Sequence, residues 1–292
     1  MATTAIRVGN EAANDVVTTW VNEFKLNPTE DMLVADFVDK LPVDGKFGQT
    51  IKVRFIPYLG YANMTTVSNA ASQNTLSRPD LTWINNTDTV VTGTSSMVYG
   101  AIRVNRNVWN QVRDDSDYRA KQKKALSLGM GEKVDFDVFN GVSGFSQTIT
   151  QADLDDAALR SGVGILRRTA KNKAKLGEAD IRLYLHPNEV ANAMGINAIK
   201  EYQIRGNAGA AATGSPVNTY GIKWDATGLV YQTGGAAYCP LMLKDALYIA
   251  YNETPHPLAD QVDGLTDVFI VVGEYATGKE FDSSGVAFVL TV

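Results

Sequence analysis

Hydrophobic and polar residues alternate along residues 50–57, TIKVRFIP, where Ile51, Val53 and Phe55 share one side and Lys52 the other. This period of two predicts a half-buried strand, and the apolar residues of 81–91 predict the strand that returns. Between them, residues 60–77 contain no charged residue and few large apolar ones. Compact domains rarely keep so long an uncharged loop unless it binds something. We therefore expect this excursion to reach away from the core toward a partner.

Two later segments have the spacing of amphipathic helices. Residues 114–139 open on an acidic cluster, which suits the positive end of a helix dipole. The predicted buried stripe of this helix consists of Leu126, Met130, Val134 and Val138. Residues 151–176 predict a second helix, in which residues 150–153 resemble a capping box.

The rest of the second half alternates short strands and turns. Residues 181–185 predict a strand, and Pro187 falls at the first turn of a short helix that ends near Gly195. After the glycine-rich loop 206–215, strands are expected at 222–224, 229–232, 241–243, 246–251, 268–273 and 286–292. Together with a strand at 99–104, this pattern predicts a mixed α+β chain.

Residues 1–45 form a leader with an amphipathic stretch of its own. The apolar residues of this stretch recur at helical spacing and are Val16, Val17, Trp20, Val21 and Phe24. Residues 32–41 predict a second short helix. The segment has too little apolar surface to fold alone, so we expect it to lie on the body or on a neighbouring subunit.

Composition narrows the class of protein. The chain has 292 residues, of which 45% are hydrophobic and 20% charged, as in ordinary globular proteins. A net charge of -5 and a pI of about 5.2 provide no basic field for nucleic acid. The single cysteine, Cys239, excludes an internal disulfide framework. The sequence lacks a signal peptide or a membrane-spanning run, so we expect a soluble protein from a reducing compartment.

Candidate chemistry is sparse. Residues 273–279, GEYATGK, match the GxxxxGK of a phosphate-binding loop, but Glu280 replaces the expected Ser or Thr and a strand follows. We interpret this segment as a hairpin turn. His186 and His256 are isolated, Cys239 suggests an inert thiol, and the basic run 167–175 suggests a solvated helix end. We therefore nominate no catalytic residue, metal ligand or cofactor.

The order of elements and several short segments carry a resemblance. The long helix ends in Asp137-Val-Phe-Asn140-Gly141, and the α/β region contains Leu183-Tyr-Leu-His-Pro187. A glycine-rich loop then precedes the segment from Tyr220 to Leu229, and the chain closes through 244–250 into strands. Over roughly residues 45–292 the chain resembles the major capsid proteins of tailed bacteriophages, which have the Hong Kong 97-like capsid fold.

The resemblance implies a domain organisation. It comprises an N-terminal arm at 1–45, an extended β-hairpin called the E-loop at 46–98, a peripheral domain with a long spine helix at 99–145 and 252–292, and an axial α/β domain at 146–251. The implied function is a structural one: self-assembly into the icosahedral head shell that encloses phage DNA.

The resemblance also implies partners and a location. The subunit would contact itself in pentamers and hexamers, and also a separate scaffolding protein, a portal and a possible decoration protein. It would enclose DNA without sequence-specific binding, contact no membrane, assemble in the host cytoplasm and end in the virion. The assembly contacts expected from the apolar residues of the arm and the excursion, with one cation, are Trp20, Phe24, Tyr61, Met64, Val67, Leu76 and Arg78.

Alternatives from two classes remain open at this point, and the first class is another self-assembling structural protein. A cellular nanocompartment shell shares the fold, and a phage tail tube subunit would be mostly β, against the two helices expected here. An enzyme that binds a nucleotide at residues 273–279 would belong to a different class. The triangulation number, the host, and the use of a cross-link or maturation protease do not follow from the sequence.

Overall fold

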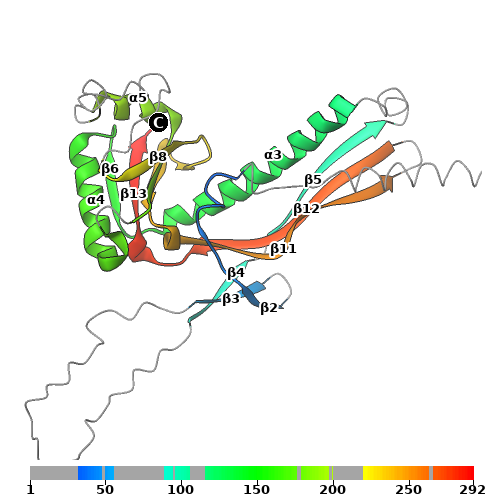
Figure 1. The fold of residues 1–292 in the computed structure, drawn as a ribbon, viewed down its shortest axis with the longest axis horizontal. Coiled ribbons are helices and arrows are strands. Elements are labelled where there is room, and N and C mark those ends of the chain that lie inside the picture. The colour runs from blue at the N-terminus through cyan, green and yellow to red at the C-terminus, as the bar shows by residue number, and fades with distance from the viewer. Residues whose placement is uncertain are drawn as a thin grey trace, which may run out of the picture.

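The computed structural model describes residues 32–47, 50–55, 89–94, 96–105, 116–175, 179–196, 199, 220–262 and 266–292. Within these ranges the chain forms three sheets, and helices accompany two of them (Figure 1). The structure confirms the α+β class. We call the two larger parts the long body and the compact body.

The long body is a four-stranded sheet with the order β1-β11-β12-β5 and one long helix. Strand β11 (Leu247–Val262) pairs antiparallel with β12 (Thr266–Lys279), which pairs antiparallel with β5 (Ser96–Asn105). The short β1 (Asp39–Lys40) runs parallel to β11. Helix α3 (Ser116–Asn140) lies along this sheet, as Figure 1 shows.

Helix α3 confirms the predicted helix and its buried stripe. Met130, Val134 and Val138 are buried, and Leu126 is half-buried against the core. Residues at spacings of three and four share one face of a helix, so these side chains all meet the sheet.

The compact body is a mixed six-stranded sheet with two helices. Its strand order is β6 (Thr148–Gln151), β13 (Gly285–Thr291), β10 (Ala236–Met242), β7 (Ile181–Leu185) and β8 (Ile222–Ala226), with β9 (Tyr231–Thr233) paired to β10. The helices are α4 (Asp156–Ala170) and α5 (Pro187–Gly195). Short 3-10 helices lie in the compact body and in the connections between the two bodies. They are η3 (Gly141–Gly144), η4 (Lys171–Ala174), η5 (Lys244–Ala246) and η6 (Asp282–Ser284).

A third, three-stranded antiparallel sheet contains the predicted strand 50–57. It consists of β2 (Val43–Phe47), β3 (Thr50–Phe55) and β4 (Thr89–Thr94), in the order β2-β3-β4. The pairing of Phe55 with Thr89 confirms that the chain leaves on one strand and returns on its neighbour. Residues 56–88, the excursion between these strands, lie outside the described residues.

Three predictions of local structure are wrong, and one of them, the hairpin turn at 273–279, is part of strand β12. Thr150 and Gln151 belong to strand β6, which pairs with β13, so residues 150–153 are not a capping box. The cap of α4 is Asp155, whose Oδ1 accepts a hydrogen bond from the backbone N of Ala158 at 2.6 Å. Residues 32–41 form a turn and then β1 instead of a helix, because their backbone groups bond to α3 and β11.

Candidate assembly surfaces

The root of the N-terminal arm, residues 32–41, is fixed to α3 by one carboxylate. Oδ1 of Asp135 accepts hydrogen bonds from the backbone N of Val34 at 3.0 Å and of Ala35 at 2.8 Å. Oδ2 accepts one from the backbone N of Leu33 at 2.7 Å. Burial raises the pKa of Asp135, although these three donors pull it the other way. The carboxylate therefore holds a turn that lies about a hundred residues away in sequence.

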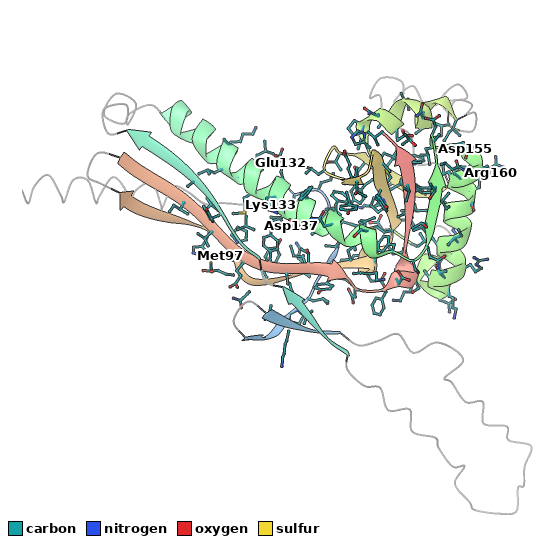
Figure 2. The ribbon with its side chains drawn as sticks, turned by 180° about the vertical axis from the view of Figure 1, so that it is seen from behind. Met97, Glu132, Lys133, Asp137, Asp155 and Arg160 are labelled. Carbon is teal, nitrogen blue, oxygen red and sulfur yellow. The ribbon has the colours of Figure 1, made fainter. Side chains whose placement is uncertain are left out.

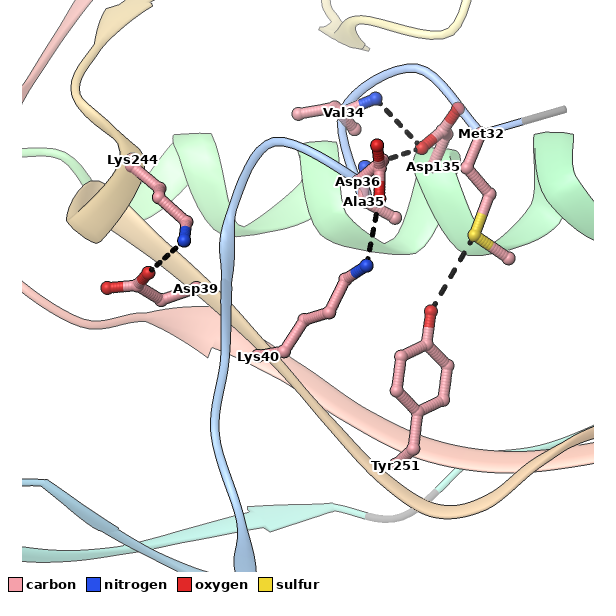
Figure 3. Close-up of polar contacts among 9 residues, drawn as sticks. All are labelled: Met32, Val34, Ala35, Asp36, Asp39, Lys40, Asp135, Lys244 and Tyr251. Carbon is pink, nitrogen blue, oxygen red and sulfur yellow. Dashed lines mark hydrogen bonds and ion pairs between the residues drawn. The ribbon is translucent and has the colours of Figure 1, made fainter. Parts of the chain in front are cut away.

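Other contacts of the arm root join it to both bodies, and Figure 3 shows those of Met32 with Tyr251 and of Asp39 with Lys244. Leu41 donates a backbone hydrogen bond to the carbonyl of Ile249 at 2.9 Å, continuing the pairing of β1 with β11. The hydroxyl of Tyr251 lies 3.6 Å from the sulfur of Met32. Phe37 contacts the compact body, where the guanidinium of Arg182 lies 4.2 Å from its ring centroid. The first described residues of the chain are thus firmly placed.

Helix α3 is attached to the sheet by a second carboxylate two residues along. Oδ2 of Asp137 accepts a hydrogen bond from the hydroxyl of Tyr275 at 2.8 Å, and Lys133 lies 2.5 Å from Oδ1. The carbonyl of Asp137 accepts one from Thr277 at 3.1 Å. Asp135 and Asp137 therefore bind the arm root and strand β12, respectively, from one turn of α3.

The root of the excursion sits on the long body through a small apolar cluster. Val53 of β3 is 0% exposed and packs with Tyr248, Ala250 and Ala276 of the long sheet. Leu41 and Val43 are partly buried and pack against this cluster. The three-stranded sheet is therefore a fixed base, and the strands that lead into and out of the excursion start from a defined position.

Large apolar side chains are exposed on both faces of the long body. Met97 is 64% exposed and Tyr99 is 73% exposed on β5, whereas Val98 between them packs against the core. Leu128 and Phe136 are also exposed, on the outer side of α3. Figure 2 shows Met97 on the sheet and Glu132, Lys133 and Asp137 on the helix. Exposed apolar side chains that gather on one element are typical of protein contact surfaces.

The GxxxxGK segment is neither a phosphate-binding loop nor the hairpin turn that we predicted. Residues 273–279 belong to β12 and pair with β11 along their length. A Cβ on Gly278 would lie 3.0 Å from the ring of Tyr248, so glycine allows the ring to cover the strand. The ammonium of Lys279 donates to the carbonyl of Gly144 at 2.6 Å and lies 3.1 Å from Asp282. These residues thus have structural partners.

The remaining candidates for chemistry occupy ordinary structural positions. Cys239 is buried in β10, and burial raises the pKa of its thiol to about 12, which supports the prediction of an inert thiol. His186 caps α5, where its Nδ1 accepts from the backbone N of Asn188 at 3.3 Å. Within the described part of the chain, no three His, Cys, Asp or Glu side chains gather as metal ligands would. Nor is any described helix long and apolar enough to span a membrane.

The assembly contacts expected from the sequence lie outside the described residues. They are Trp20, Phe24, Tyr61, Met64, Val67, Leu76 and Arg78. Among the described residues, the candidates are Asp135, which holds the arm root, and the exposed Met97 and Tyr99 on β5. One signal could have indicated Asp135: an acidic residue beside Val134 falls on the buried side of the predicted helix.

The similarity of this chain to known proteins lies in its three-dimensional structure. No family model matches the sequence, and no curated protein matches it. Solved structures do match. The capsid of Ralstonia phage GP4 has a TM-score of 0.61 at 14% identity, over 88% of this chain and 87% of that chain. The mature capsid of bacteriophage PhiM1 has a TM-score of 0.60 at 11% identity, over 89% and 87%.

The chain has the Hong Kong 97-like capsid fold. A virus-like particle from Pyrococcus furiosus is also similar, with a TM-score of 0.53 at 10% identity over 94% of this chain and 96% of that chain. The capsid fold thus accounts for nearly all of the chain and confirms the resemblance read from the order of its elements. Because the identities are low, only the fold follows from this likeness.

Proposed function

We propose that this chain is a major capsid protein that self-assembles into the icosahedral head shell enclosing phage DNA. The observation that carries the proposal is the agreement with phage capsid structures over 88% of the chain, with similar coverage of theirs. A structural role without catalysis agrees with the positions of Lys279 and Cys239, the residues considered above as candidates for chemistry. Lys279 makes a hydrogen bond, and Cys239 is buried.

The domain organisation implied by the resemblance becomes part of this proposal. The proposed axial domain at 146–251 makes up most of the compact body, and the proposed peripheral domain at 99–145 and 252–292 makes up most of the long body. The bounds differ at two places, because β13 pairs within the compact sheet and the first residues of β11 pair within the long sheet. Helix α3 is the spine helix. The arm at 1–45 and the E-loop at 46–98 are the two appendages, and the fixed arm root and the three-stranded base support this division.

Contacts between subunits would come from these appendages and from the exposed apolar residues. The arm would contribute Trp20 and Phe24, and the excursion Tyr61, Met64, Val67 and Leu76, with Arg78 near its base. On the body, Met97 and Tyr99 are exposed and supply apolar surface for a neighbour. Ordering an extended segment costs free energy, which keeps the affinity of each single contact low. Many such weak contacts suit a closed shell that assembles reversibly.

The partners follow from the same proposal. The subunit would form pentamers and hexamers, with a separate scaffolding protein, a portal and a possible decoration protein. The net charge of -5 supports enclosure of DNA without tight binding to it. The protein would assemble in the host cytoplasm, reside in the virion and use no cofactor.

A cellular nanocompartment shell is the second candidate function. The likeness to the Pyrococcus furiosus virus-like particle favours it, because a particle outside the tailed phages shares the fold. Neighbouring genes separate the two: portal and terminase genes would favour a phage head, and a cargo enzyme gene would favour a nanocompartment. The nucleotide-binding enzyme has no such support, because residues 273–279 form a paired strand.

Negative-stain electron microscopy with light scattering tests the proposal. The purified chain, alone or co-expressed with its neighbouring genes, should give closed shells. A chain that stays a monomer of 31.6 kDa in both preparations would overturn the proposal.

A further inference from the structure

The two bodies of the chain meet where three connections cross side by side. These are residues 140–148 after α3, residues 243–247 between β10 and β11, and residues 279–285 between β12 and β13. The last two are bonded to each other, since Glu280 donates its backbone N–H to the carbonyl of Ala246 at 3.0 Å and Phe281 donates to Asp245 at 3.2 Å. A change in the angle between the bodies has to bend the chain here and to shift the contacts of Phe37 and Phe139 with the compact body.

Charged groups from both bodies surround this crossing. Lys173 of η4, in the compact body, lies 2.5 Å from Asp245 and stacks 3.9 Å from the ring centroid of Phe281. From the other side, Asp39 of β1, in the long body, pairs with Lys244 at 3.3 Å. Together with Glu280, the cluster holds three carboxylates and two ammonium groups. It carries one excess negative charge when every member is ionised.

Glu280 differs from the other members of this cluster because one of its carboxylate oxygens, Oε2, is buried and has no hydrogen-bond partner among the described residues. Burial, followed by the charges of Asp39 and Asp245, raises the pKa of Glu280 to about 7, although Lys173 acts in the other direction. Tyr248 of β11 also faces Glu280, since its own pKa is raised by burial and by Glu280. Lys279 and Asp282, which flank Glu280 in sequence, pair with each other at 3.1 Å. The observed arrangement therefore favours a protonated Glu280.

We propose that Glu280 is the proton-binding residue of a hinge between the long and the compact body, so that ionising it changes the angle between them. A protonated Glu280 leaves the cluster electrically balanced and compatible with the observed packing. An ionised Glu280 favours an arrangement in which its carboxylate reaches water. In a shell, such a change would alter the curvature, but the inference concerns the subunit and does not require assembly.

The direction of the pH effect follows from linkage. The folded pKa of about 7 lies above the ordinary value of about 4.3 for an unfolded glutamate. The stabilisation that the proton on Glu280 gives to the folded state is thus fully present below about pH 4, and it is lost as the pH rises through about 7. A hinge state with a solvated Glu280 would gain population over the same interval, by up to roughly a hundredfold.

Spin labels on the two bodies test the proposal. The exposed Glu132 of α3 and Arg168 of α4 are replaced by cysteine, labelled, and diluted with unlabelled full-length chain. Cys239 is 0% exposed and does not compete for the label. Pulsed electron resonance then measures the distance distribution from about pH 5 to about pH 9. We expect a second distance population to rise with pH, with its midpoint near the pKa of Glu280, about 7.

Three variants separate Glu280 from other titrating groups. Glu280→Gln, which mimics the protonated form, should show the low-pH distribution at every pH. Asp39→Asn removes one charge that raises the pKa of Glu280 and should move the midpoint to lower pH. Glu253→Gln, on the exposed part of β11, should behave like the parent. One distribution at all pH values in the parent, or a pH response that persists in Glu280→Gln and therefore comes from another group, would overturn the proposal.

Discussion

Replacing Asp135 with alanine removes the acceptor that holds the arm root. The backbone N–H groups of Val34 and Ala35, residues that are 0% exposed, would lose their partner, and so would that of Leu33. Each buried donor without a partner costs about 1–3 kcal/mol. Loss of a buried carboxylate offsets part of this cost, because burial raises the pKa of Asp135. We expect a net loss of about 3 kcal/mol in the free energy of unfolding.

Urea unfolding followed by circular dichroism measures this loss. Asp135→Asn keeps one carbonyl oxygen for Val34 and Ala35, so we expect a smaller loss of about 1–2 kcal/mol. Glu132→Ala, on the exposed side of the same helix, is the matched control and should stay within about 0.5 kcal/mol of the parent. If Asp135→Ala unfolds like this control, the carboxylate does not hold the arm root and the reasoning is refuted.

Three further changes test other parts of the structure. Gly278→Ala places a Cβ 3.0 Å from the ring of Tyr248 and should cost about 1–3 kcal/mol in urea unfolding; an unchanged midpoint would contradict the packing. Calorimetry should detect no saturable ATP binding to the parent, and Lys279→Met should lower only stability, by about 1 kcal/mol. Replacing residues 60–77 by a short Gly-Ser turn should leave a folded body, by circular dichroism, that no longer forms shells under the electron microscope.

The sequence predicts those elements whose signal is local. The stripe from Leu126 to Val138 defines α3 because helical spacing is repeated over several turns, and the structure confirms it. Pro187 and Gly195 mark α5 by their preferences at helix ends, and these bounds are confirmed as well. The order of such elements was sufficient to suggest the capsid fold, which the structural comparisons confirm.

Features that depend on distant partners could not be predicted. Strand β11 runs through Pro255 and Pro257, which break a strand pattern in sequence. The pairing with β1 ends at Ile249, so β11 beyond that residue has β12 as its neighbour on one side and tolerates proline on the other. Asp135 likewise finds its partners about a hundred residues away.

The assembly contacts expected in the arm and the excursion lie outside the described residues and stay predictions. The uncharged stretch 60–77 indicates a binding segment, and the structure provides its fixed base on Val53 and Tyr248. The exposure of Met97 and Tyr99 could not be predicted, because alternation within a strand does not reveal which face of the strand meets the helix.

A cryo-electron microscopy reconstruction of the assembled protein tests the central claim most directly. The account predicts closed icosahedral shells in which residues 58–80 of one subunit lie across its neighbour and α3 and β11–β12 keep the arrangement of Figure 1. Rods, open aggregates, or shells in which residues 58–80 contact only their own subunit would contradict it.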